Sequence, residues 1–117
     1  DAGVALGITE MLRGVVSADG TGSKADAAAF TVAGKTGTAK KLKGGVYQDD
    51  SYLAVFTGLS PAKNPEIVVA VVIDDPKQNG FYGGQVAAPV FSKVASRVLR
   101  YLDVKPDIEK IARPVSG

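Results

Sequence analysis

The chain has 117 residues, of which 45% are hydrophobic and 22% charged, and its formal net charge is +2. This composition is typical of one globular domain or of part of a larger one. The absence of cysteine and histidine excludes disulfides, thiolate–zinc sites, histidine–metal sites and a Ser-His-Asp triad. The small charge gives no basis for binding nucleic acid, and no apolar run approaches the ~18 residues that span a bilayer. We therefore expect no metal and no cofactor, and any membrane anchor of the parent protein should lie outside this sequence.

The first expected element is an amphipathic helix over residues 4–16. Its apolar side chains recur at helical spacing, at Ala5, Ile8, Leu12 and Val15. The helix begins without an obvious capping residue, which suggests that the chain continues upstream. A turn-rich segment follows at residues 19–23.

Three strands are predicted next. Residues 31–39 form a short strand interrupted by glycines, residues 40–50 a Gly- and Lys-rich connection, and residues 52–57 and 67–73 two clear strands. The link between the last two is short enough for an antiparallel pair. The third strand is apolar throughout, so we expect it to be covered on both faces and to pair with a further strand. The chain alone is therefore expected to be an incomplete domain.

A second helix is expected from Pro89 to about residue 102, because proline is well tolerated in the first helical turn. One apolar stripe of this helix contains Val90, Val94, Val98 and Leu102, and Phe91, Ala95 and Leu99 lie beside it. Residues 1–105 then form the domain, and residues 106–117 a frayed C-terminal tail. The predicted fold is of the α/β (α+β) class, an antiparallel sheet covered by helices.

The segment Val-Ala-Gly-Lys-Thr-Gly-Thr-Ala-Lys at residues 32–40 is the most informative for chemistry. A phosphate-binding P-loop would need glycine at Ala29 and a helix directly after Thr36, and neither requirement is met. As a strand, the segment places Lys35 and Gly37 on one face and Thr36 and Thr38 on the other. An exposed edge strand of this kind can bind an extended peptide as an added strand. From the triplet alone, a lysine on a solvated strand remains an equal alternative.

The wider context contains further motifs in a fixed order. They are Gly-Thr-Gly-Ser-Lys-Ala (20–25), Val-Ala-Gly-Lys-Thr-Gly-Thr-Ala (32–39), Phe-Thr-Gly-Leu-Ser-Pro (56–61), Val-Val-Ile-Asp-Asp-Pro (71–76) and Tyr-Gly-Gly-Gln-Val-Ala-Ala-Pro-Val-Phe (82–91). Together they resemble the C-terminal part of the transpeptidase domain of class B penicillin-binding proteins, of the septal, cell-division type. The resemblance extends over about residues 4–105 and implies a partial β-lactamase/transpeptidase-like fold.

The resemblance implies a peptidoglycan D,D-transpeptidase that uses a serine acyl-enzyme and is trapped by β-lactams. The resemblance implies that Lys35 would hold the positive charge and hydrogen-bond the serine of the family's Ser-x-Asn motif. Thr36 and Thr38 would bind the ligand carboxylate next to Gly37. The backbone N–H of Thr38 would form half of the oxyanion hole.

Four more residues, Lys40, Tyr47, Phe81 and Tyr82, fall where the family has residues at the rim of the cleft. The implied partners are the D-Ala-D-Ala stem peptide, β-lactams, the remainder of the transpeptidase domain and cell-division proteins. The implied location is the periplasmic face of the bacterial inner membrane.

The family's two other motifs are missing from this sequence. Ser60 and Lys63 have the spacing of the family's Ser-x-x-Lys motif, but the prolines at 61 and 65 disfavour the helical turn that it requires. No Ser-x-Asn occurs. We therefore expect this chain to supply the Lys-Thr-Gly strand without the nucleophile, and to be inactive alone. A serine β-lactamase, a β-lactam sensor and a non-catalytic binding module on the same fold remain alternatives.

Overall fold

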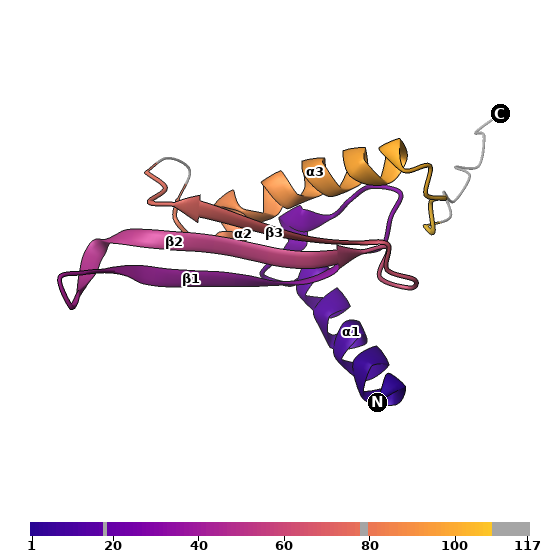
Figure 1. Ribbon diagram of the computed structural model, residues 1–117, viewed down its shortest axis with the longest axis horizontal. Coiled ribbons are helices and arrows are strands. Elements are labelled where there is room, and N and C mark those ends of the chain that lie inside the picture. Colours follow the sequence, from indigo (N-terminus) through magenta and orange to yellow (C-terminus); the bar gives the residue numbers. More distant parts are fainter. Residues whose placement is uncertain (18, 78–79, 109–117) are drawn as a thin grey trace.

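The computed structural model describes residues 1–17, 19–77 and 80–108. The elements follow one another as α1 (Ala2–Val16), a 3₁₀ turn η1 (Ser23–Ala25), β1 (Ala33–Lys43), β2 (Val46–Ser60), β3 (Ile67–Asp74), α2 (Gly83–Val86) and α3 (Ala88–Tyr101). Figure 1 shows α3 lying along one side of the sheet and α1 projecting away on the other. The predicted class, an antiparallel sheet with helices, is confirmed. No helix in the described ranges is both long and apolar enough to cross a membrane.

The three strands pair in the order β1-β2-β3, and both pairs are antiparallel. The β1–β2 hairpin is longer than predicted, because residues 40–50 continue both strands instead of forming a loose connection. Gly44 and Gly45 turn the chain with φ angles of +59° and +78°, which suits a two-residue hairpin turn. The hairpin extends beyond the helices into solvent (Figure 1), so its side chains show no apolar alternation from which a strand could be predicted.

One face of the sheet packs against α3 and is called here the helix-covered face. Thr36 lies opposite Phe56, and Phe56 lies opposite Val71, so these three side chains share this face. Phe56 is fully buried and its ring lies 4.7 Å from that of Phe91 in α3, at 58°. The two rings form the centre of the core.

The other face is called here the open face. Its central row consists of Lys35, Thr57 and Ala70, which lie opposite one another and are all exposed. On β3, Val68 and Val72 are 71% and 59% exposed. The prediction that this apolar strand requires cover on both faces is therefore not met within the described part of the chain.

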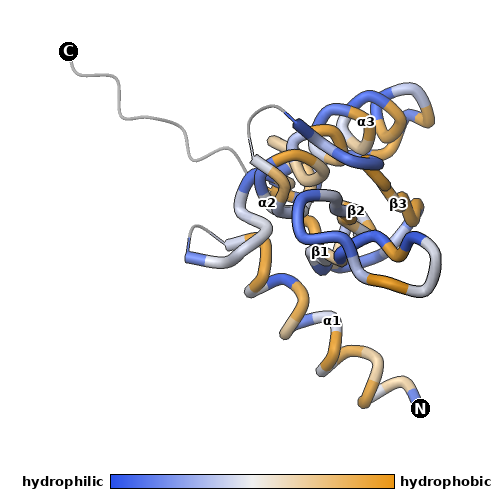
Figure 2. The backbone as a smooth tube through the Cα atoms, turned by 90° about the vertical axis from the view of Figure 1, so that its left-hand side faces the viewer, coloured by the Kyte–Doolittle hydropathy of each residue, from blue (hydrophilic) through white to orange (hydrophobic). Residues whose placement is uncertain are grey.

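Helix α1 differs from the prediction in two respects. It begins at Ala2 and is capped by Asp1, whose carboxylate accepts hydrogen bonds from the N–H groups of Gly3 and Val4. Its apolar stripe does not enter the core: Ile8 is 51% exposed and the helix has no buried residue. In Figure 2 most of the helix stands clear of the sheet, and Val16 near its C-terminal end packs against the core.

Helix α3 was correctly placed, but the structure buries the other apolar stripe. The buried residues are Ala88, Phe91, Ala95 and Leu99, whereas Val90 and Val94 are each 39% exposed and Leu102 is 53% exposed. Alanine at two contact positions lets the helix lie close to the sheet, and Phe91 then fills the space beside Phe56.

The segment after α3 is anchored as far as the structure describes it. The Asp107 carboxylate accepts hydrogen bonds from the N–H and the hydroxyl of Thr31, at 2.7 and 2.5 Å. The N–H groups of Asp107 and Ile108 donate to the carbonyl of Ala29. Residues 106–108 of the expected frayed tail are thus bound to the segment that leads into β1, and residues 109–117 lie outside the described residues.

Candidate functional site

The Lys-Thr-Gly segment lies on β1, which forms one edge of the described sheet. Residues 34–36 continue as strand and do not lead into a helix, so a P-loop is excluded. An edge strand has backbone N–H and C=O groups on its outer side that no strand of this sheet pairs with. In the described residues the segment thus lies at an edge of the sheet, as expected.

Lys35 and the two threonines lie on opposite faces of the sheet, as strand alternation predicts. The Lys35 side chain is exposed on the open face, and its ammonium donates a 3.1 Å hydrogen bond to the carbonyl of Thr36. Thr36 and Thr38 point to the helix-covered face, since they lie opposite the buried residues Phe56 and Ala54. The cation and the hydroxyls therefore flank the same strand from two sides.

Thr36 and Thr38 line a hollow of about 410 Å³, called here the hydroxyl hollow. Its remaining lining residues are Thr21, Ser23, Lys24, Tyr82, Gly83, Gly84 and Gln85. Its lining includes one cation and four hydroxyl-bearing Ser and Thr side chains, and no carboxylate among the residues that the structure describes. Hydroxyl donors beside an ammonium group are the chemistry that binds a carboxylate.

Helix α2, which sequence reasoning treated as loop, holds β1 from the helix-covered side. The Gly83 N–H donates a 3.0 Å hydrogen bond to Thr38 Oγ1. A Cβ atom at Gly83 would lie 2.6 Å from the Gly37 carbonyl oxygen and 2.3 Å from that of Val55. Only glycine permits this close approach of the backbone of α2 to the two strands. Gly37 is therefore in direct contact with α2.

Two of the aromatic residues assigned to the rim, Phe81 and Tyr82, form a cluster with Tyr52, which the sequence did not suggest. The rings of Tyr52 and Phe81 stack at 4.1 Å and 13°, and Tyr82 follows at 4.5 Å from Phe81. Tyr82 is 56% exposed and lines the hydroxyl hollow. Lys40 lies opposite Tyr52 in the sheet, and its ammonium contacts Asp49 at 3.2 Å. Lys40 thus follows the threonines on β1, and the aromatic cluster that contains Phe81 and Tyr82 lies beside this part of the strand.

Tyr47 is placed differently from the other predicted rim residues. It lies opposite Leu42, beyond the register shift between Lys40 and Leu42 and next to the hairpin turn. Its side chain is 68% exposed and does not line the hydroxyl hollow. The structure therefore does not bring Tyr47 together with Thr36 and Thr38.

Sequence reasoning missed several residues of the hollow, namely Thr21, Ser23 and Gln85. Thr21 Oγ1 lies 3.2 Å from Thr36 Oγ1, across 15 residues of sequence. The Gly-Thr-Gly-Ser-Lys-Ala motif contained the relevant signal, but nothing in the sequence indicated which face of which strand it would meet.

The Ser-x-x-Lys spacing at Ser60 does not form a nucleophile. Ser60 is the last residue of β2 and is fully buried, and its hydroxyl donates a 2.7 Å hydrogen bond to the carbonyl of Thr31. The Lys63 ammonium instead reaches the carbonyl of Asp107 at 3.4 Å. The rejection of this pair as catalytic residues is confirmed.

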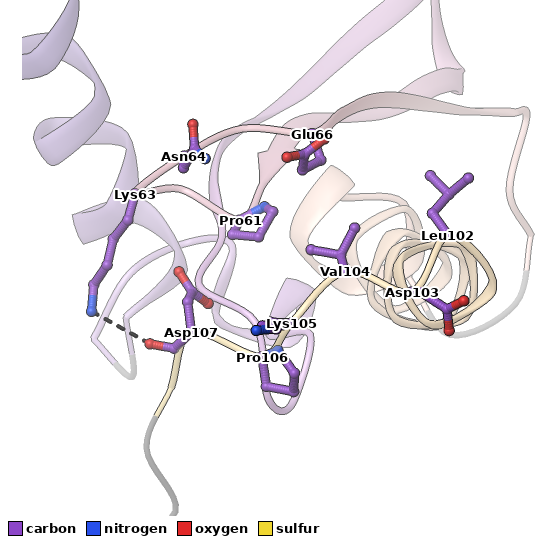
Figure 3. Close-up of a pocket in the computed structure, with 10 residues that line it drawn as sticks. All are labelled: Pro61, Lys63, Asn64, Glu66, Leu102, Asp103, Val104, Lys105, Pro106 and Asp107. Atoms are coloured by element: carbon purple, nitrogen blue, oxygen red, sulfur yellow. Dashed lines mark hydrogen bonds between the residues drawn. The ribbon is translucent and has the colours of Figure 1, made fainter.

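A second hollow, of about 510 Å³, lies between the β2–β3 link and the segment after α3 (Figure 3). Charges of both signs line it, from Lys63 and Glu66 to Asp103 and Lys105. It shares no residue with the hydroxyl hollow. The dashed line in Figure 3 marks the contact between Lys63 and Asp107 that ties its two walls together.

Shifted pKa values occur at the far end of β3, outside the hydroxyl hollow. Hydrogen bonds from Lys77 and then from Ser51 hold the pKa of Asp75 below its ordinary value. The hydrogen bond to Asp74 raises the pKa of Lys41, and that to Asp75 raises the pKa of Lys77. These shifts describe surface ion pairs. In the described ranges no group of acidic side chains has the arrangement of a metal site.

Comparison with known proteins gives the same assignment as the geometry. Residues 1–96 match the family model of the penicillin binding protein transpeptidase domain, and the chain belongs to that family. It is 47% identical over 105 residues to a protein of Neisseria flavescens described as a probable peptidoglycan D,D-transpeptidase, PenA; the match covers 90% of this chain and 26% of that protein.

Two solved structures support the fold. The transpeptidase domain of Burkholderia pseudomallei penicillin-binding protein 3 matches with a TM-score of 0.78 and 44% identity, over 86% of this chain and 30% of that one. Penicillin-binding protein 3 of a Mycobacterium, solved in complex with ampicillin, matches with a TM-score of 0.81 and 34% identity, over 97% and 27%. The chain thus spans between 26% and 30% of the length of each of these three proteins.

Proposed function

We propose that this chain forms one wall of the active site of a peptidoglycan D,D-transpeptidase of the septal, cell-division type. The observation that best supports this proposal is the edge position of β1, with the hydroxyls of Thr36 and Thr38 lining the hydroxyl hollow. The names of the relatives agree with it, since that of N. flavescens is described as a peptidoglycan D,D-transpeptidase.

The proposed reaction transfers an acyl group through a serine that the rest of the protein supplies. The serine oxygen attacks the carbonyl carbon of the penultimate D-Ala of a stem peptide. The C–N bond to the terminal D-Ala breaks, and the leaving amine takes a proton. An amine of a neighbouring strand then attacks the ester carbonyl and loses a proton, which restores the serine hydroxyl. A β-lactam acylates the same serine, but its acyl group is retained.

The residues of β1 have separate roles in this reaction. The terminal carboxylate of the stem peptide, or that of a β-lactam, accepts hydrogen bonds from the hydroxyls of Thr36 and Thr38. Lys35, with Lys24 at the hollow, adds the positive potential that favours an anionic ligand. The backbone N–H of Thr38 donates to the oxygen that becomes negative when the serine attacks.

The rim residues form the outer part of the proposed cleft. Phe81 stacks on Tyr52, and Tyr82 is tilted against Phe81. The rings of Phe81 and Tyr82 offer an apolar surface to the side chain of a β-lactam. Lys40 lies on the same face of β1 as Thr36 and Thr38. Its ammonium is paired with Asp49, which places Lys40 at the border of the proposed site. Tyr47 is exposed on the projecting hairpin. We keep it as an outer rim residue, apart from the hydroxyl hollow.

The cellular setting is part of the same proposal. A transpeptidase of this type works on the periplasmic face of the bacterial inner membrane, anchored by a segment outside the sequence described here. Its partners are the remainder of the transpeptidase domain and proteins of the division machinery. Residues 1–105 belong to the domain, and residues 106–117 follow it.

The test is covalent labelling by a fluorescent penicillin. The full-length protein should form a stable adduct, and the 117-residue chain alone should not, because the attacking serine is absent. Rapid release of hydrolysed penicillin by the full-length protein would instead indicate a serine β-lactamase. Absence of any labelling, with the fold intact by circular dichroism, would indicate a non-catalytic module and overturn the proposal.

A further inference from the structure

The hydroxyls of Thr36 and Thr38 each have a neighbour on the helix-covered side of β1. For Thr38 the neighbour is the N–H of Gly83, at 3.0 Å. For Thr36 it is the hydroxyl of Thr21, at 3.2 Å. The two contacts come from different elements, α2 and the loop before η1, yet they meet the same strand within the hydroxyl hollow.

The two contacts differ in what they allow. A backbone N–H can only donate, so Thr38 Oγ1 accepts from Gly83, and the proton of the Thr38 hydroxyl stays available to a ligand. Between Thr21 and Thr36 either hydroxyl can be the donor. A carboxylate can only accept, so Thr36 must direct its single proton to the ligand, and Thr21 must then donate to Thr36.

We propose that Thr21 is a positioning residue that orients the hydroxyl of Thr36 as a hydrogen-bond donor toward the ligand carboxylate. The inference rests on the proposed function, in which Thr36 and Thr38 bind that carboxylate. It gives Thr21 the role toward Thr36 that the Gly83 N–H has toward Thr38. With the ligand bound, each hydroxyl thus accepts a hydrogen bond from its neighbour and donates its own proton to the carboxylate.

The loop holds Thr21 in place for this role. The carbonyl oxygen of Thr21 lies where a side chain at Gly84 would stand, 2.0 Å from an added Cβ. The next residue, Gly22, donates its N–H to the carbonyl of Val15 at the end of α1, at 2.8 Å. Thr21 is thus fixed between α1 and α2, and binding a ligand requires little additional ordering of the loop.

The experiment uses the full-length protein that contains this chain and measures acylation by benzylpenicillin over a range of concentrations. This separates the dissociation constant of the complex before acylation from the rate constant of the chemical step. Thr21→Val should raise the dissociation constant about five- to tenfold, the effect of one hydrogen bond that supports an anionic ligand. Thr21→Ser, which keeps the hydroxyl, should restore a value within about twofold of wild type.

A double-mutant cycle with Thr36→Val tests whether Thr21 acts through Thr36. In the Thr36→Val background, Thr21→Val should change the dissociation constant less than about twofold. Thr9→Val in α1, where the hydroxyl donates only to the helical carbonyl of Ala5, is the matched control and should leave binding unchanged. Thermal midpoints of all variants should agree with that of wild type, and Thr21→Ala judged against Thr21→Ser gives the same comparison if the valine variant is unstable.

The inference is overturned if Thr21→Val binds benzylpenicillin as wild type does. It is also overturned if its loss persists undiminished beside Thr36→Val, or if Thr21→Ser is as impaired as Thr21→Val. A failure of the proposed function looks different, because the wild-type protein itself would then form no acyl-enzyme.

Discussion

The two faces of the sheet differ in what covers them and in which part of the site they present. The helix-covered face is closed by α3 around Phe56 and directs Thr36 and Thr38 into the hydroxyl hollow. The open face exposes Val72 beside the row that contains Lys35. The hydroxyls that we propose to bind a carboxylate thus lie on the helix-covered face, and the cation lies on the face that the described residues leave exposed.

This difference indicates which face of the sheet is completed by this chain and which by the remainder of the domain. Burial of apolar surface is the main stabilising term of folding, and among the described residues it is the helix-covered face that is buried. The partners of Lys35 must approach from the open side of β1, where Thr57 and Ala70 are exposed in the described part of the chain. We expect the remainder of the domain to bring the attacking serine and the cover for Val68 and Val72 together.

The largest effect should come from the centre of the helix-covered face. Phe56→Ala should lower the free energy of unfolding of the 117-residue chain by about 3–5 kcal/mol, because Phe56 is fully buried against Phe91. Val72→Ala, on the open face, should change it by less than about 0.5 kcal/mol. Urea denaturation followed by circular dichroism measures both. Equal losses for the two variants would mean that the open face is packed in solution.

Lys35 tests the functional side of the comparison. Lys35→Ala in the full-length protein should slow penicillin acylation about a hundredfold or more, the size typical of removing one preorganised electrostatic group. The thermal midpoint should stay close to that of wild type, because the Lys35 side chain is exposed. Lys43→Ala, on the same strand beside the hairpin turn, is the control and should acylate normally. An unchanged rate for Lys35→Ala would remove Lys35 from the site.

The smallest effect concerns Asp75, just beyond the end of β3. Because Lys77 and Ser51 hold its pKa below the ordinary value, its contribution to stability is complete above the unfolded-state pKa and is lost as pH falls through the folded-state pKa. Asp75→Asn should therefore flatten the acid decrease in thermal midpoint between about pH 5 and about pH 3. Asp19→Asn, on the exposed loop after α1, is the control. A wild-type slope in Asp75→Asn would show that the ion pair does not persist in solution.

The sequence alone determined the chemistry-bearing strand and its polarity. Side chains alternate along a strand whatever surrounds it, so Lys35 on one face and Thr36 and Thr38 on the other followed from the order of residues. The order of motifs also determined the family. The second helix was predictable as well, since Pro89 and the apolar repeat after it are local signals.

The tertiary structure decided what depends on partners distant in sequence. Residues 40–50 extend the two strands because backbone hydrogen bonds pair them across the Gly44–Gly45 turn. Both faces of this hairpin are exposed to solvent, so its sequence needs no alternation of apolar and polar residues that would reveal a strand. α3 buried Phe91, Ala95 and Leu99, not Val90 and Val94, because the way the helix packs on the sheet decides which of its two apolar stripes faces the core. Thr21 met Thr36 only because α1, α2 and β1 converge there, a contact that no local pattern can specify.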